Sequence, residues 1–306
     1  MKVLVLHTLP PASVTDDRIV YEFDLAAAAK NVADQIPGSI VRSVAGEARE
    51  ILETVCEVHP DVVFNLCEAP LARTDLESHA AALFEWIGVR FTGCGSETLA
   101  LCRRKDRTNA LLHAAGIRVP LPVVASQPHF PCIVKPLAED GAAGIHSWSV
   151  CDNPEELRNA LEKATLPFFV QAFVPGREFV VSLWGRSSPD YSSIGEMLFA
   201  PDQRLVTYDA KWDSDSFVFR NSSLTYSSKI DPNLREEILG AARGAWRTVG
   251  ARHAIRVDIR LDVLGAPHVL DVNPNPEISP EVGICRGVIE AGWPFQEFVR
   301  KLIEWA

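Results

Sequence analysis

The chain has 306 residues, of which 47% are hydrophobic, so it can bury a sizeable core and is long enough for two or three packed subdomains. Its formal net charge is −10 and its basic residues form only short runs, which argues against a nucleic-acid backbone or an anionic membrane surface as a partner. Small anionic molecules are not excluded, because a local cluster of lysines and a metal can overcome the overall charge.

The seven cysteines are scattered and contain no CxxC pair, which argues against a disulfide framework or a zinc ribbon and suits a reducing compartment. They lie at positions 56, 67, 94, 102, 132, 151 and 285. The apolar start Val3–Leu6 is too short for a signal sequence. No apolar run approaches the roughly 20 residues of a membrane helix. We therefore expect a cytoplasmic protein with neither nucleic acid nor membrane as a partner.

The first third of the chain alternates strand and helix patterns. Short apolar runs predict strands at Lys2–Leu6, Asp61–Asn65 and Gly88–Gly93. Helices are predicted between them, at Asp16–Lys30 and at Asp75–Ile87. Strands that alternate with helices are typical of a parallel, doubly wound sheet. Residues 1–98 are therefore predicted to form an N-terminal α/β domain.

The rest of the chain predicts two α+β units, at residues 99–174 and 175–306. A helix is expected from Glu97 to Ala115 with Gly116 at its C-cap, followed by a connector with prolines at 120, 122, 128 and 131. A second helix should follow Asn153, and a long one should span Pro232–Val249 before a hairpin and two terminal helices. Strands are predicted at Cys132–Lys135, His146–Val150, Phe168–Ala172 and Glu178–Trp184.

The hairpin carries the most informative pattern. Positions 255–262 alternate strictly, so the apolar side chains face one side of a strand, and the other side carries Arg256, Asp258, Arg260 and Asp262. In a second strand, His268–Asn273, Asp271 and Asn273 share a face. A turn centred on Leu264-Gly265 places Asp258 opposite Asp271, and Arg256 opposite Asn273.

Two carboxylates that face each other about 5 Å apart repel unless a cation lies between them. Oxygen ligands of this kind suit Mg²⁺, which keeps water ligands and is completed by substrate phosphates. Asp258, Asp271 and Asn273 are therefore candidate metal ligands. The alternative is a solvated charged face in which Arg256 and Arg260 neutralise the acids.

A lysine and a small-residue loop suggest a phosphate site. Lys135 ends an apolar strand and is followed by proline, and the loop that comes next contains Gly141, Ala142 and Gly144. Such a loop lets backbone N–H groups approach phosphate oxygens, although a plain hairpin turn has the same composition. Lys105, Lys211 and Glu178 are ordinary solvated charges when each is considered alone.

Motifs for covalent catalysis are absent from the sequence. It has no GxSxG, no HExxH, no Walker A and no GxGxxG. A nucleotide must therefore be bound by some other loop.

Taken in order, the motifs resemble the ATP-grasp superfamily, in particular the D-alanine–D-alanine ligase branch. The resemblance extends from about residue 60 to the C-terminus and implies an ATP-grasp fold, with an N-terminal doubly wound domain and two α+β subdomains that clasp ATP. Its segments are Leu99–Arg107, Ile133–Pro136, Val174–Phe179, Tyr208–Trp212, Arg256–Asp258 and Leu270–Pro274.

By this resemblance, Lys105, Lys135 and Lys211 would neutralise ATP phosphates, and Glu178 would hold the ribose. The Gly141–Gly144 loop would close over the triphosphate, and the adenine would lie near the linker Gln171, Ala172, Phe173 and Val174. Asp258, Asp271 and Asn273 would bind one or two Mg²⁺, with Mn²⁺ as a substitute. Arg256 would stabilise the acyl phosphate, so Arg256, Lys211 and Gly141 are the expected catalytic positions.

Several departures from the family pattern concern the substrate. The glycine-serine-serine loop is replaced by Asp140-Gly141-Ala142, and the tyrosine after the lid lysine is Trp212. An N-terminal glycine-rich segment with a substrate-binding glutamate is replaced by residues 7–11, and Pro274–Pro280 replaces the segment with the acceptor-binding serine. Sites built around buried polar contacts reject substrates that lack the partner. The sequence thus predicts a carboxylate–amine ligase for small molecules other than two D-alanines.

Three alternatives stay open: a cyclising ligase, a nucleotide-binding regulator without catalysis, and a kinase-like enzyme that stops at phosphorylation. The fold analogy is also compatible with a homodimer.

Overall fold

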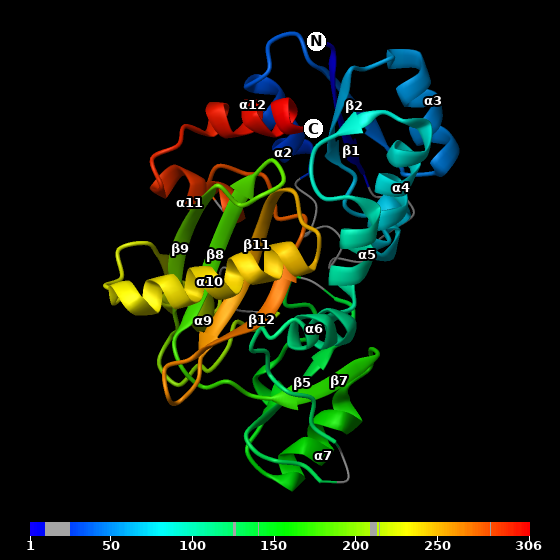
Figure 1. The fold of residues 1–306 in the computed structure, drawn as a ribbon. Coiled ribbons are helices and arrows are strands. Elements are labelled where there is room, and N and C mark those ends of the chain that lie inside the picture. Colours follow the sequence, from blue (N-terminus) through cyan, green and yellow to red (C-terminus); the bar gives the residue numbers. More distant parts are fainter. Residues whose placement is uncertain (10–24, 125–126, 140, 209–212, 214, 282) are drawn as a thin grey trace.

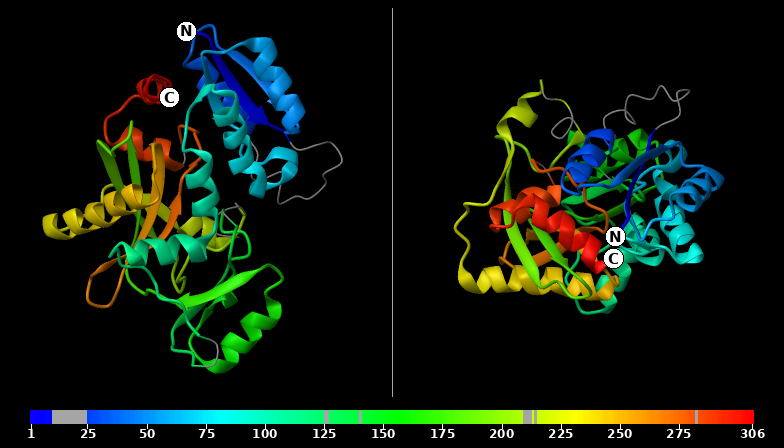
Figure 2. Two further views of the ribbon diagram at one scale, coloured as in Figure 1. Left: turned by 45° about the vertical axis from the view of Figure 1, so that its right-hand side comes forward. Right: turned by 90° about the horizontal axis from the view of Figure 1, so that it is seen from above.

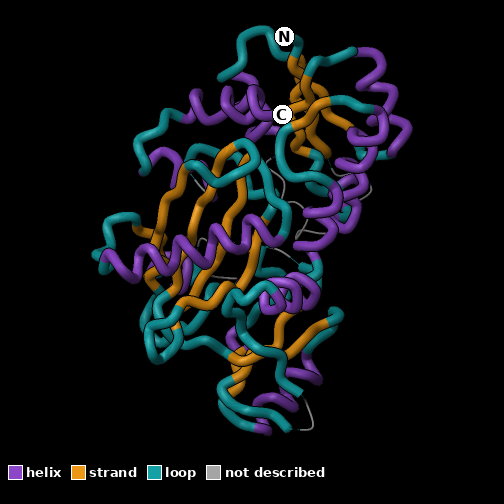
Figure 3. The backbone as a smooth tube through the Cα atoms, in the orientation of Figure 1, coloured by secondary structure: helices purple, strands orange, loops and turns teal. Residues whose placement is uncertain are grey.

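Three β-sheets follow one another along the chain in the computed structural model, which describes residues 1–9, 25–124, 127–139, 141–208, 213, 215–281 and 283–306 (Figures 1 and 3). None of the helices among these residues is both long and apolar enough to cross a membrane.

The N-terminal sheet is parallel, with strand order β2-β1-β3-β4. Its strands are β1 (Val3–Thr8), β2 (Ile40–Val44), β3 (Val62–Leu66) and β4 (Arg90–Phe91). Its helices are α2 (Leu25–Asp34), α3 (Ala48–Val58) and α4 (Glu77–Ile87), with the short 3-10 helices Pro70–Ala72 and Thr74–Leu76 before α4. Every residue of β1 and β3 is buried, as expected for central strands covered on both faces. The predicted doubly wound arrangement is confirmed.

Some elements of the N-terminal domain differ from the predicted ones. The edge strand β2 was not predicted, because the exposed residues Arg42 and Ser43 interrupt its apolar pattern. The helix α3 was not predicted either. The strand predicted at Gly88–Gly93 is only the two residues of β4. The helix predicted at Asp16–Lys30 lies outside the described residues up to position 24, and α2 continues beyond its predicted end to Asp34.

The central sheet is antiparallel, with order β6-β5-β7. Its strands are β5 (Cys132–Pro136), β6 (Val150–Cys151) and β7 (Phe168–Ala172), and α7 (Pro154–Lys163) packs on it. The Asn153 side chain caps α7 by accepting from the N–H groups of Glu155 and Glu156. The strand predicted at His146–Val150 is wrong in its bounds. His146 and Ser149 instead form a capping box that makes Ser147–Ser149 a 3-10 turn.

The C-terminal sheet is antiparallel, with order β10-β9-β8-β11-β12. Its strands are β8 (Glu178–Gly185), β9 (Tyr191–Leu198), β10 (Ser223–Thr225), β11 (His253–Leu261) and β12 (Pro267–Asn273). The apolar side chains of β8 and β11 pack on the long helix α10 (Pro232–Thr248). The opposite face carries the charged positions of β11 and is covered at one end by α11 (Gly283–Glu290). The remaining helices are α9 (Phe217–Asn221) and α12 (Phe295–Trp305).

Two hydrophobic cores cross the predicted domain boundaries. One joins β1 and β3 to β8, β11 and α10. The other joins the opposite face of the same N-terminal strands to α2, α11 and α12, so that the C-terminus lies beside the N-terminal sheet (Figure 2). The boundaries at residues 98 and 174 therefore remain predictions.

Candidate active site

The β11–β12 hairpin has the predicted register at its carboxylates. Asp258 is opposite Asp271, and Arg256 is opposite Asn273. The pairing does not arise from a regular ladder after a turn at Leu264-Gly265, as predicted. Beyond Asp258 the register shifts, and Ile259 pairs with Val269. The turn is thus centred on Leu264 alone, and a β-bulge at Leu270 restores the pairing of the two acids. A regular ladder from the same turn would place Leu270 opposite Asp258.

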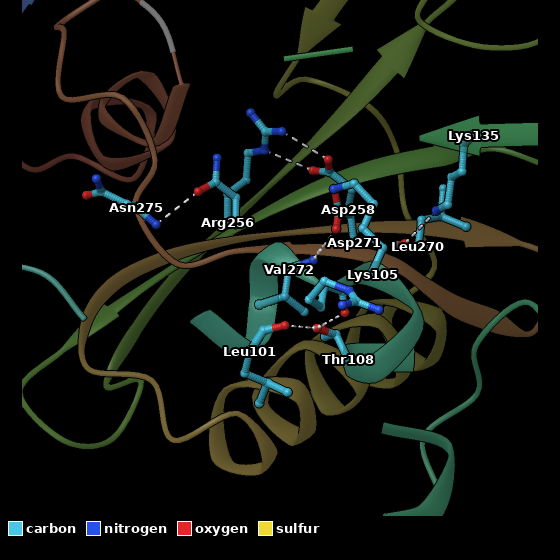
Figure 4. Close-up of polar contacts among 12 residues, drawn as sticks. Leu101, Lys105, Thr108, Lys135, Arg256, Asp258, Leu270, Asp271, Val272 and Asn275 are labelled. Atoms are coloured by element: carbon cyan, nitrogen blue, oxygen red, sulfur yellow. Dashed lines mark hydrogen bonds and ion pairs between the residues drawn. The ribbon is translucent and has the colours of Figure 1, made fainter. Parts of the chain in front are cut away.

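Basic groups hold both carboxylates (Figure 4). The Arg256 guanidinium donates to Asp258 through two bonds of 3.0 Å each. The ammonium of Lys105 lies 2.5 Å from Oδ2 of Asp271. Burial acts to raise the pKa of Asp271, but the ammonium groups of Lys105 and Lys135 outweigh it, so the pKa of this carboxyl lies below its usual value. Each acid of the facing pair is therefore paired with its own basic side chain, Asp258 with Arg256 and Asp271 with Lys105.

Lys105 reaches the hairpin because the helix predicted over Glu97–Ala115 is broken into α5 (Ser96–Arg103) and α6 (Lys105–Ala114). Arg104 has non-helical dihedral angles (φ −92, ψ 87) and pairs with Asp106, which turns the chain between the two helices. The hydroxyl of Thr108 in α6 donates to the carbonyls of Leu101 in α5 and of Arg104, and so links the two helices (Figure 4). Lys105 is thereby the first residue of α6 and only 9% exposed.

Lys135 approaches the same carboxylates from the central sheet. It donates to the carbonyl of Leu270 at 3.3 Å, and its ammonium lies 5.1 Å from the ring of Phe169. Burial lowers the pKa of Lys135 to about 8, with Lys105 acting in the same direction and Asp271 opposing it. A phosphate beside this lysine would favour its charged form.

Glu178 begins β8 and forms an ion pair of 2.6 Å with Arg260, its register partner on β11. Burial raises the pKa of Glu178, and the guanidinium of Arg260 opposes the shift. Arg260 was noted in the sequence only as a charge that could neutralise the acids. Its position on the Asp258 face was the available signal, whereas its pairing with Glu178 depends on the neighbouring strand.

The loop after Lys135 adopts backbone conformations that favour glycine. Gly141 and Gly144 have φ of +66° and +71°, and Ala142 has φ of +64°. Gly141 and Ala142 line the cavity described below. Gly144 packs behind the loop instead, where an added Cβ would lie 2.6 Å from Cγ of Pro136. Its expected contact with a bound phosphate stays a prediction.

A cavity of about 510 Å³ brings the predicted residues together. Its lining includes both lysines, the small-residue loop and the acidic hairpin, with Arg256 beside them. Apolar side chains such as Leu205, Phe219 and Leu224 complete the wall. Lys211, predicted as a phosphate ligand, lies outside the described residues. The predicted residues that line the cavity are Lys105, Lys135, Gly141, Ala142, Gln171, Ala172, Phe173, Val174, Glu178, Arg256, Asp258, Asp271 and Asn273.

The hairpin residues fit a magnesium ion by their chemistry. Asp258, Asp271 and Asn273 can bind a cation through carboxylate and amide oxygens, the ligand atoms that Mg²⁺ prefers. The side-chain oxygen of Asn273 also accepts from the N–H of Asn275 at 2.9 Å, and a carboxylate or amide oxygen retains a lone pair for a cation. Within the described residues, no three His, Cys, Asp or Glu side chains gather as a metal site. The mixed carboxylate–amide set on the hairpin is therefore the candidate.

Comparison with known proteins defines the class. The family model for the D-ala D-ala ligase C-terminus matches residues 119–304, more than half of the chain. The chain therefore belongs to the D-alanine–D-alanine ligase family of the ATP-grasp superfamily. It is a ligase-like, ATP-binding protein of this class, as the ordered motifs predicted.

Particular relatives support this assignment. The D-alanine–D-alanine ligase of Pseudothermotoga lettingae is 25% identical over 272 residues, which cover 84% of this chain and 86% of the relative. That of Haemophilus influenzae is 27% identical over 240 residues, 72% of this chain and 76% of the relative.

Solved structures share the fold. A Bacillus anthracis D-alanine–D-alanine ligase complexed with ATP superimposes with a TM-score of 0.74 at 14% identity, covering 99% of this chain and 96% of that chain. The D-Ala:D-Ser ligase VanG of Enterococcus faecalis gives 0.74 at 18% identity, with 99% and 98% covered.

Proposed function

We propose that this protein is an ATP- and Mg²⁺-dependent ligase that activates a small-molecule carboxylate as an acyl phosphate and joins it to an amine. The observation that carries the proposal is the cavity in which the facing acids Asp258 and Asp271 lie beside Lys105, Lys135 and Arg256. Charges placed in this way neutralise a triphosphate and its metal. Phosphoryl transfer needs such positioning and neutralisation more than it needs a protein nucleophile.

In the nucleotide half of the cavity, Lys105 and Lys135 would bind phosphates, together with Lys211 of the lid motif. Glu178 would accept from a ribose hydroxyl. The linker Gln171–Val174 would contact the adenine through backbone groups. Two of its N–H groups already donate within the protein, from Ala172 to Leu121 and from Phe173 to Pro131, so the linker is held in place for this role.

The reaction has two steps. A substrate carboxylate oxygen attacks the γ-phosphorus of ATP, the bond to the β–γ bridging oxygen breaks, and ADP leaves. An amine then attacks the acyl carbon, phosphate leaves, and the amine loses a proton as the amide forms. Mg²⁺ held by Asp258, Asp271 and Asn273 would supply charge neutralisation at the phosphates. Arg256 would stabilise the acyl phosphate and the oxyanion of the second step.

The substrates proposed here differ from a pair of D-alanines. Pro274–Pro280 stands where the family's acceptor-binding segment is expected, and Asn275 within it donates to Glu77 of α4 at 2.6 Å. This contact ties the end of the hairpin to the N-terminal domain. The residues expected to bind an amino-acid ammonium and carboxylate are thus replaced, while the residues proposed for ATP are kept.

A phosphate-release screen over pairs of amino acids and small acids, at fixed ATP and Mg²⁺, tests this proposal. We expect turnover to require a carboxylate and an amine, and D-alanine alone to support little of it. Turnover with D-alanine alone that matches a dedicated D-alanine–D-alanine ligase would contradict the substrate proposal. Phosphorylated product without any amide would instead indicate a kinase-like reaction.

Arg256→Ala separates an enzyme from a nucleotide-binding regulator. We expect this variant to bind Mg·ATP within a few-fold of wild type and to lose about 10²-fold or more in turnover, because its role concerns the acyl phosphate. Arg243→Ala, at an ion-paired arginine of α10, is the matched control and should keep wild-type turnover. Equal turnover in Arg256→Ala and wild type would exclude the catalytic role.

A further inference from the structure

Arg260 is the most enclosed charged side chain of the cavity wall and is only 3% exposed. Its Nε donates to Oε2 of Glu178 at 2.6 Å. Its Nη1 donates to the carbonyl of Val174 at 3.1 Å, and its Nη2 donates to the carbonyl of Arg204. The three acceptors belong to the start of β8, to the β7–β8 linker and to the segment after β9. One planar group therefore joins three separate segments.

Aromatic rings limit the movement of this guanidinium. Its central carbon lies 5.0 Å from the ring centroid of Phe173 and 5.1 Å from that of Phe199, within the range of cation–π attraction. Phe173 itself belongs to the linker proposed to contact adenine. A buried arginine that donates one hydrogen bond from each of its three nitrogens and is flanked by rings has little freedom to reorient, so the groups bound to it keep a fixed spacing.

Glu178 is held asymmetrically. Arg260 takes its Oε2 atom, whereas Oε1 makes no hydrogen bond to any residue that the structure describes. Glu178 lines the cavity, so this second oxygen is the acceptor offered to a ligand. Without Arg260, the flexible side chain of Glu178 could take several rotamers, and its distance from the Val174 carbonyl would no longer be set.

We propose that Arg260 is the positioning residue of the nucleotide half: it fixes the ribose acceptor Glu178 relative to the adenine-contacting linker, and so sets the preference for ribonucleotides over deoxyribonucleotides. This inference rests on the proposed function, in which Glu178 accepts from the ribose. A hydrogen bond to a charged acceptor contributes more to affinity when the acceptor is already in place, because ordering the acceptor during binding costs side-chain entropy.

The test is calorimetric binding of Mg·ATP, Mg·2′-deoxy-ATP and Mg·3′-deoxy-ATP to the wild-type chain, Arg260→Met, Arg260→Lys and Arg243→Met. Wild type should prefer ATP over at least one deoxynucleotide by about tenfold or more. In Arg260→Met this preference should fall below about threefold. Arg260→Lys, which keeps a charge but not the planar set of donors, should lie between them. Arg243→Met is the matched control and should keep the wild-type preference.

A double variant tests whether Arg260 acts through Glu178, and circular dichroism checks that the variants fold. Arg260→Lys in a Glu178→Gln background should cause no additional loss of preference, because the acceptor it positions is already altered. Where Arg260→Met does not fold, as judged by circular dichroism, Arg260→Lys carries the test. A ribose preference that is unchanged in the folded Arg260 variants, with all three nucleotides weakened equally, overturns the inference, as does a wild type without any ribose preference. Failure of the wild type to bind Mg·ATP would instead overturn the proposed function.

Discussion

At the scale of single residues, His253 joins three parts of the chain. It begins β11 and is 1% exposed. The N–H of Gly93, after β4, donates to its Nδ1 atom at 3.0 Å, and its ring also hydrogen-bonds the backbone of Trp305 in α12. Burial and the neighbouring Arg252 lower the pKa of His253 to about 3. The folded protein therefore contains this histidine in its neutral form.

This shift predicts a loss of stability in mild acid. The pKa of a histidine is about 6.5 in the unfolded chain, so below that pH the unfolded state binds a proton that the folded state excludes. The stability contributed by neutral His253 is present above pH 6.5 and is lost as the pH falls toward 3. Between pH 7.5 and pH 5 this loss should be about 2 kcal/mol in the free energy of unfolding measured with urea.

His253→Asn should reduce this pH dependence. Asparagine tolerates the positive φ of this position (64°), and its carbonyl oxygen can accept from Gly93. His7 remains in the variant and also makes the free energy of unfolding decrease as the pH falls, because burial lowers its pKa. The control is His59→Asn, at an exposed histidine with φ of 48°, which should keep the wild-type slope. An undiminished slope in His253→Asn would show that the neutral imidazole is not its source.

At the scale of elements, α11 approaches the C-terminal sheet through a glycine. A Cβ added to Gly287 would lie 2.6 Å from Oγ of Ser182 and closer still to Oγ of Ser193. These two buried serines are register partners on β8 and β9. Ser182 is also the register partner of Arg256 on β11, so the packing of α11 bears directly on the row of residues that reaches the active site.

Gly287→Ala should therefore destabilise the protein although alanine favours helices. Overpacking of a close helix–sheet contact costs about 1–3 kcal/mol. Gly240→Ala is a matched comparison, because Gly240 lies within α10 with open space around its Cα, and there the substitution should stabilise by up to about 1 kcal/mol. Urea unfolding of both variants measures the difference. If Gly287→Ala stabilised the protein as Gly240→Ala is expected to, α11 would be able to shift away from the sheet without cost.

At the scale of the whole molecule, the last helix completes the first domain. Phe298, Val299, Leu302 and Ile303 of α12 are buried in the core that contains one face of β1 and β3. Arg90 of β4 also donates to the backbone carbonyl of Ala306 at 2.9 Å. The N-terminal sheet is thus covered by a segment from the opposite end of the sequence.

Removal of residues 294–306 should abolish cooperative folding. Burial of four large apolar side chains contributes about 6–12 kcal/mol, which is comparable with the entire free energy of unfolding of a typical domain. Thermal unfolding followed by circular dichroism would show a broad transition or none. Replacing the exposed ion pair Lys301–Glu304 by two alanines is the control and should cost at most about 1 kcal/mol. A truncated chain that unfolds as sharply as the full chain would contradict this role of α12.

Local patterns predicted most of the elements and many residues of the candidate site. Strict alternation in residues 255–262 predicted which side chains of β11 share a face, because successive residues of a strand point to opposite sides. The register of Asp258 and Asp271 was also predicted, although it depends on a bulge at Leu270 that no periodicity reveals. Capping and turn residues such as Asn153 and Gly116 indicated helix ends, since their hydrogen bonds and dihedral angles are set within a few residues.

Only the tertiary structure decided which charges meet. Lys105 and Asp271 are separated by 166 positions, and they pair because the α5–α6 break directs the lysine toward the hairpin. Arg260 pairs with Glu178 because the β8–β11 register places them opposite each other, and α12 packs against the N-terminal sheet in a shared core. Such contacts depend on how separate elements pack, and many sequences with the same local periodicity would pack differently. The sequence by itself therefore determined most of the elements and the ordered ligase-family motifs, whereas the packing of distant segments determined the charge pairs of the cavity.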